Sequence, residues 1–154
     1  MLLLALPVWG QPSLPKPEGW VYDAAHVLDA ATKAQLNALA ADVEQQTSAE
    51  IAIVVVGTTA PQTPKQYVTA LFNHWGVGKR GADNGVMILL AVQDRRIEIE
   101  TGYGVEGILP DGKVGEIIRT AMLPHLRQQA WGVGLVAGVQ RIAQVLHQDS
   151  PAAP

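Results

Sequence analysis

Apolar residues recur along this chain with two spacings, and each spacing predicts a different kind of element. An unbroken apolar run at 51–56, rich in β-branched residues, predicts a strand that is covered on both faces, and a second apolar run follows at 86–92. Residues 96–100 instead alternate polar and apolar side chains, which is typical of a strand with one wetter face. Because only residues 93–95 separate these last two runs, we expect them to pair antiparallel as a hairpin.

The intervals between these runs show the helical spacing. A helix is expected from the cap residue Asp29 to about Gln46, and another over 64–75, where glycines follow. Apolar positions over 114–121 predict a third helix that ends at Pro124. The final helix begins near Trp131 and carries two glycines that allow close approach to a neighbouring element, Gly134 and Gly138.

Together these elements predict an α/β fold with three layers. The strand at 51–56, the helix at 64–75 and the strand at 85–92 form a βαβ unit with parallel strands, and residues 20–22 add a very short strand. The result is an α/β/α sandwich around a small, mixed and mostly parallel sheet that ends in the β-hairpin.

Composition narrows the class of protein. The chain has 154 residues, of which 48% are hydrophobic and 16% charged, which is enough for one compact domain with its own core. The net charge is -3 and no basic patch is evident, so nucleic acid is not expected as a partner. The absence of cysteine excludes disulfides, thiolate metal sites and thiol catalysis.

The N-terminus carries a short apolar segment that is too short to span a membrane. Residues 1–10 end in a small residue but lack the basic start of a complete signal peptide, so we interpret 1–19 as a residual signal-like segment followed by a Pro-rich linker. The expected domain covers 20–147, and 148–154 is expected to be a disordered tail. This predicts a periplasmic or otherwise extracytoplasmic protein. The alternative is a disordered apolar terminus on a cytosolic protein.

The hairpin also predicts a candidate site. Antiparallel pairing brings the start of its first strand beside the end of its second, so Asp83, Glu106 and Asp111 are expected at one rim of the sheet. Asn84 and Glu50 lie at the same end and complete the candidate ligands. Oxygen-only sets of this kind suit Ca²⁺, and less readily Mg²⁺. The alternative is that these are solvated loop acids, with Asp83 and Asp111 acting as turn or cap residues.

Other chemical motifs are weak. Residues 102–107 match G-x-G-x-x-G, but they follow the second arm of a hairpin, and Leu109–Gly112 precede the next helix. We therefore expect no nucleotide, and we expect the glycines to let a tight loop turn over the sheet rim. No local sequence assembles a nucleophile, a base and an oxyanion donor, so no catalytic residue is predicted.

An ordered series of short motifs resembles the TPM domain, which is shared by thylakoid-lumen photosystem II repair proteins and YgcG-like bacterial proteins. The resemblance covers about residues 20–147. It rests on Asp23-Ala24 with Leu28, Glu50 to Val55, Leu71 to Gly78, Asp83 to Val86, Arg96 to Glu100 and Gly102 to Gly107.

The resemblance implies a Rossmann-like α/β/α sandwich in a protein that faces away from the cytosol. Among relatives, it implies roles in assembly and repair of a membrane complex, calcium binding and acid phosphatase activity. Many relatives carry a C-terminal membrane helix and a glycine-rich tail; this sequence ends at Pro154 with neither, so no tether of that kind is expected.

The sequence thus favours a non-enzymatic module that binds a divalent cation and serves a membrane or envelope protein complex. The alternative is a metal-assisted acid phosphatase that uses the same carboxylates, with Lys79, Arg80 and Lys113 as the only candidate cations near the phosphoryl group.

Overall fold

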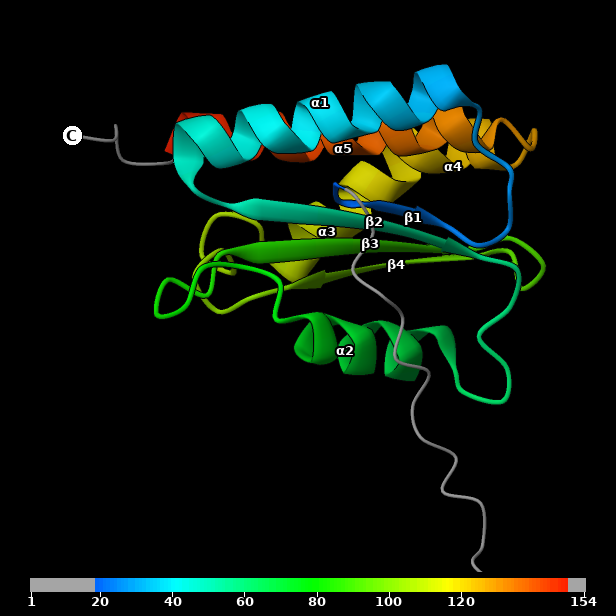
Figure 1. Ribbon diagram of the computed structural model, residues 1–154, viewed down its shortest axis with the longest axis horizontal. Helices are drawn as coiled ribbons and strands as arrows, with labels where there is room; N and C mark the ends of the chain where they lie inside the picture. Colours follow the sequence, from blue (N-terminus) through cyan, green and yellow to red (C-terminus); the bar gives the residue numbers. More distant parts are fainter. Residues whose placement is uncertain (1–18, 150–154) are drawn as a thin grey trace, which may run out of the picture.

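The computed structural model describes residues 19–149, which fold into a sheet covered by helices on both faces (Figure 1). The predicted signal-like segment and most of the predicted tail lie outside these residues. The last helix continues to Asp149, past the expected domain end at 147. Among the described residues, no helix is both long and apolar enough to cross a bilayer.

The sheet has four strands in the order β1-β2-β3-β4. They are β1 (Val21–Asp23), β2 (Glu50–Val56), β3 (Gly85–Ala91) and β4 (Arg96–Thr101). The first three are parallel, and β4 runs antiparallel to β3, as the hairpin prediction required. The register places Glu50 opposite Gly85 and Val86 opposite Thr101. The start of β2, the start of β3 and the end of β4 therefore lie together at one end of the sheet, the rim.

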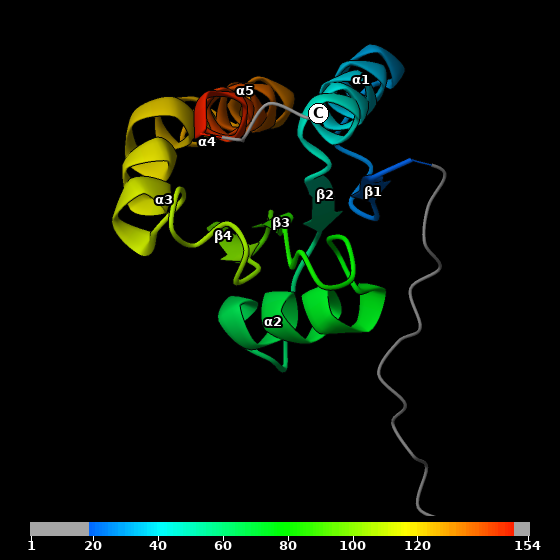
Figure 2. The ribbon, with the colours of Figure 1, turned by 90° about the vertical axis from the view of Figure 1, so that its left-hand side faces the viewer.

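Helices cover the two faces unequally. The long helices α1 (Ala30–Thr47) and α5 (Trp131–Asp149) lie together on one face, and α2 (Pro64–Trp75) lies alone on the other (Figure 2). Alternate residues of the central strands pack into two hydrophobic cores, one on each face of the sheet. Ile53 and Ile88 pack toward α1 and α5, whereas Val54 and Leu89 pack toward α2, and all four are fully buried. The three-layer prediction is confirmed.

The segment after the hairpin differs from the prediction, because the helix does not end at Pro124. A short helix α3 (Asp111–Ile117) passes into a π-helical turn η1 (Ile118–Met122) and then into α4 (Leu123–Leu126). The N–H of Leu123 bonds to the carbonyl of Ile118, so the extra residue in the turn re-phases the helix. Pro124 then falls in the first turn of α4, where its missing N–H is not needed.

The two glycines of α5 allow the predicted close approach to this segment. A Cβ added at Gly138 would lie 2.5 Å from Met122 Sδ, and one at Gly134 would lie 2.7 Å from Leu126 Cδ2. The glycines therefore seat α5 directly on η1 and α4, which fixes where the N-terminal end of α5 meets the sheet.

Candidate functional site

The predicted rim forms where two loops meet at the edge of the sheet. The N–H of Gly102 donates to the carbonyl of Gly85 at 2.9 Å, and the N–H of Gly104 donates to the carbonyl of Asp83 at 2.8 Å. These bonds extend the β3–β4 pairing beyond the strands and hold the loop before β3 against the glycine-rich loop after β4. The backbones that carry Asp83 and Glu106 are therefore neighbours, as the hairpin geometry predicted.

The glycines of the G-x-G-x-x-G stretch have a structural task at this rim. A Cβ at Gly104 would collide with the carbonyl oxygen of Ala82, and one at Gly102 would collide with that of Asp83. Only glycine lets the two backbones approach this closely, whereas Gly107 has open space around it. This agrees with the prediction that the motif shapes the loop, and the stretch leads into Leu109 and Pro110 instead of opening directly into a helix.

The three outer acids of the predicted set are exposed to solvent. Asp83 lies in the turn before β3 with a φ of 48°, Glu106 lies in the glycine-rich loop, and Asp111 is the first residue of α3. None of the three takes part in a salt bridge between described residues. Among the described residues, no group of three or more His, Cys, Asp or Glu residues is arranged to hold a metal ion. The three carboxylates therefore do not converge on one point.

Glu50, also predicted as a ligand, is a buried carboxylate with partners within the protein. Only 8% of the residue is exposed, and Oε1 accepts the N–H of Gly78 at 3.0 Å while Oε2 contacts Lys79 Nζ at 2.7 Å. Lys79 Nζ also lies 2.6 Å from Glu44 Oε1. The two carboxylates, Glu44 foremost, raise the pKa of the Lys79 ammonium above its usual 10.5. Glu50 thus pins the loop after α2, and its charge is already compensated.

The side-chain amide of Asn84 also forms hydrogen bonds within the protein. Its Oδ1 accepts the N–H of Lys79 at 2.8 Å, and its Nδ2 donates to Ser48 Oγ at 2.9 Å. The amide therefore ties the loop before β3 to the C-terminal end of α1. Of the five predicted ligands, Glu50 and Asn84 hydrogen-bond within the rim. Asp83, Glu106 and Asp111 are exposed at its surface.

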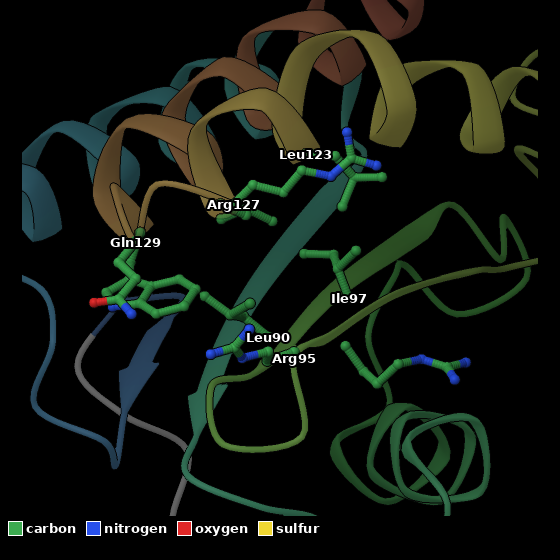
Figure 3. A pocket seen from close by; sticks show the side chains of 9 residues that line it. Leu90, Arg95, Ile97, Leu123, Arg127 and Gln129 are labelled. Carbon is green, nitrogen blue, oxygen red and sulfur yellow. The ribbon is translucent and has the colours of Figure 1, made fainter.

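A pocket that was not predicted from the sequence lies at the opposite end of the strands, near the end of β3 and the start of β4. It lies between the β3–β4 hairpin and the α4–α5 connection (Figure 3). Arg95 reaches it from the hairpin turn and Arg127 from the end of α4, although the two residues are far apart in the sequence. The only sequence signal for it is the adjacent pair Arg95–Arg96 at the short connection of the hairpin.

This hairpin turn is held in place by Asp94. Its carboxylate accepts the hydroxyl of Thr58 at 2.9 Å and the N–H of Thr59 at 2.9 Å, which lower the pKa of Asp94, with the Thr59 N–H as the larger cause. The turn is thereby fixed to the loop after β2, and the next residue, Arg95, adopts a φ of 51°. The basic side chain beside the pocket therefore extends from an ordered backbone.

Comparison with known proteins assigns the chain to a family. The profile of the TPM domain matches residues 21–145, which is most of the chain and the whole of its sheet. The chain belongs to the TPM domain family. This confirms the resemblance drawn from the motif series, and no curated protein matches the sequence.

Solved structures share the fold of this TPM domain. The N-terminal domain of a protein from P. gingivalis is 32% identical, with a TM-score of 0.79, and the match covers 86% of this chain and 85% of that one. The N-terminal domain of the cg2496 protein from Corynebacterium glutamicum has a TM-score of 0.69 at 16% identity, covering 94% and 89%. The BA42 protein from Bizionia argentinensis has a TM-score of 0.69 at 24% identity, covering 82% and 86%. At these lower identities the likeness concerns the fold alone.

Proposed function

We propose that this TPM domain is a non-enzymatic extracytoplasmic module that binds Ca²⁺ at the acidic rim and serves as an accessory factor for a membrane or envelope protein complex. The observation that carries the proposal is the hydrogen bond from the Gly104 N–H to the Asp83 carbonyl, at 2.8 Å. It holds two acid-bearing loops side by side, and neither acid has a cationic partner among the described residues.

The chemistry of the rim favours a flexible oxygen site. Ca²⁺ accepts six to eight oxygen ligands in irregular geometry, including carboxylates, backbone carbonyls and water. Asp83 and Glu106 supply two carboxylates from neighbouring loops, and Asp111 begins the next helix. Because these groups do not converge, the loops must adjust on binding, which suits Ca²⁺ better than Mg²⁺ with its strict octahedral geometry. Glu50 and Asn84, the other two candidate ligands, hydrogen-bond to the neighbouring loop and hold it in place.

A partner surface at the same rim is supported by Tyr103. This side chain is 84% exposed in the loop that also carries Glu106. Exposed tyrosines supply large contact area at a low cost in side-chain entropy, so they are enriched at protein interfaces. Ca²⁺ that orders this loop would present Tyr103 to the partner complex.

Calorimetric titration of the whole chain with CaCl₂ tests the metal site. The unchanged protein should bind Ca²⁺, and Asp83→Asn/Glu106→Gln should bind at least tenfold more weakly. The double variant Asp42→Asn/Glu116→Gln removes the same charge from exposed helical positions and should bind as the unchanged protein does. Equal affinity in both double variants, or no binding heat in the unchanged protein, would refute the proposed site. Fractionation of cells that express the chain tests the location.

The alternative, a metal-assisted phosphatase, is less well supported by the charges at the rim. Phosphoryl transfer requires positive charge from protein or metal. Lys79, one of the three candidate cations with Arg80 and Lys113, is held between Glu44 and Glu50. Hydrolysis of para-nitrophenyl phosphate that requires Ca²⁺ or Mg²⁺ and is abolished by Glu106→Ala would reverse this preference.

A further inference from the structure

The pocket at the hairpin end has a volume of about 160 Å³ and combines an apolar wall with basic side chains. Figure 3 shows Arg127 and Arg95 on either side of Ile97, coming from different elements, with the Arg127 side chain extending toward Leu123. Its apolar lining comes from both the sheet and the helices over it: Leu90, Ile97, Leu123, Leu126 and Trp131.

The positive charge of Arg95 and Arg127 is not neutralised by any residue that the structure describes. Neither Arg95 nor Arg127 forms a salt bridge among the described residues, and no acidic side chain lines the pocket. Arg96 also borders it, but its guanidinium pairs with Glu98 at 3.2 Å. Two uncompensated guanidinium groups at one concave site favour an anion, and their planar donors suit the oxygens of a carboxylate or phosphate.

The apolar wall determines what the anion must be attached to. Leu90 is only 2% exposed, and the indole of Trp131, the first residue of α5, provides an aromatic surface. A cavity of about 150 Å³ accommodates a benzene ring in other proteins, so this pocket has room for one six-membered ring. An inorganic ion would leave the apolar lining unused.

The position of the pocket supports a ligand site that is independent of the acidic rim. It lies over Leu90 and Ile97, near the carboxyl end of β3, whereas Asp83 precedes the amino end of the same strand. In open α/β sheets, ligands bind in the crevice at the carboxyl ends of the parallel strands. The helix α5 begins at Trp131, so the positive end of its dipole lies beside the pocket.

We propose that this pocket binds a small organic anion consisting of a ring-sized apolar body and one carboxylate or phosphate group. Arg95 and Arg127 supply the positive charge that attracts the anionic group, and the ring packs between Ile97 and Trp131. This site shares no residue with the proposed Ca²⁺ site.

The test uses the whole chain and two-dimensional ¹H–¹⁵N NMR, with the indole N–H of Trp131 as the local reporter. Benzoate and phenyl phosphate serve as anionic ligands, benzyl alcohol as the neutral analogue, and inorganic phosphate as the anion without a ring. At least one aryl anion should shift the Trp131 signal and bind at least tenfold more tightly than benzyl alcohol or inorganic phosphate. Comparison of the two aryl anions then identifies the preferred anionic group.

Arginine variants connect the binding to the pocket. Arg127→Gln and Arg95→Gln should each weaken binding of the preferred anion about tenfold, and added NaCl should weaken it in the unchanged protein. Arg141→Gln removes the same charge from an exposed position on α5 and should leave the affinity unchanged. Neutral and anionic ligands binding equally well, or Arg141→Gln weakening the binding as much as the pocket variants, would overturn the proposal.

Discussion

At the residue scale, Glu50 shows how a single buried carboxylate organises the acidic rim. Charged groups are rarely buried unless every charge and lone pair is compensated. Here one carboxylate oxygen accepts a backbone N–H and the other binds an ammonium group, so Glu50 fastens the loop after α2 to the start of β2. The exposed acids depend on that support, because Asn84, next to Asp83, bonds to the N–H of Lys79.

Removing the Glu50 carboxylate should therefore destabilise the fold. Glu50→Ala leaves the Gly78 N–H without its acceptor and Lys79 with one carboxylate, and we expect a loss of about 1–3 kcal/mol in the free energy of unfolding. Glu50→Gln should cost less, because its amide oxygen can still accept from Gly78. Glu44→Gln, on the more exposed partner, should cost about 1 kcal/mol or less. Urea denaturation measures all three, and a larger loss for Glu44→Gln than for Glu50→Ala would contradict this account.

Lys79 should give the stability a dependence on alkaline pH. Its pKa is raised above 10.5 in the folded protein, so the folded state holds this proton more tightly than the unfolded chain does. The stabilisation is complete below pH 10.5 and is lost as the pH rises through the folded pKa. Lys79→Met should therefore show a shallower alkaline loss of stability than the unchanged protein. Lys113→Met, at an exposed position without a salt bridge among the described residues, should keep the original slope in urea denaturation between pH 8 and 11.

At the element scale, the sequence predicted the strands and the helices α1, α2 and α5 closely, and it missed only the path of the segment from α3 to α4. The strands carry unambiguous patterns, and their hairpin has too short a connection to pair in another way. The error at Pro124 arose because helical periodicity assumes 3.6 residues per turn throughout. One π turn changes that phase and lets a proline follow without ending the helical path.

The contact between the two rim loops gives a prediction that tests this element directly. Gly104→Ala should lower the free energy of unfolding by about 1–3 kcal/mol, because its methyl group would press on the Ala82 carbonyl and separate the loops. Gly107→Ala lies in the same loop with open space around it and should change the stability little. Urea denaturation compares the two, and calcium titration of Gly104→Ala should show weakened binding. Equal stability of the two variants would mean that the loops do not touch as described.

At the scale of the whole molecule, the sequence predicted which residues lie at the same end of the sheet, but not which of their side chains are in contact. Strand register follows from local patterns, so the gathering of Asp83 and Glu106 at one rim was predictable. The pairing of Glu50 with Lys79 depends on how the intervening loop folds back, and no periodicity records that. Arg95 and Arg127 meet at a pocket only because the π turn and the α5 glycines set the path of α4.

The two proposed sites lie at opposite ends of β3, so they should act independently. Ligands that bind only the folded state raise its stability, and sites without shared residues add their effects. Saturating Ca²⁺ and a saturating aryl anion should therefore each raise the Tm, and together they should raise it by the sum of the separate shifts. Differential scanning calorimetry measures this, and a combined shift well below the sum would show that the sites are coupled.

The edge strand β4 has a consequence for the behaviour of the protein in concentrated solution. It ends the four-stranded sheet, so its outer backbone groups have no strand partner among the described residues. One face of β4 carries charged residues at alternate positions, Arg96, Glu98 and Glu100, and Lys65 of α2 forms a salt bridge with the last of them. Charged edges of this kind oppose the addition of another strand. We therefore expect the sheet to resist edge-to-edge aggregation, and neutralising these three charges would create a surface on which further copies of the chain stack.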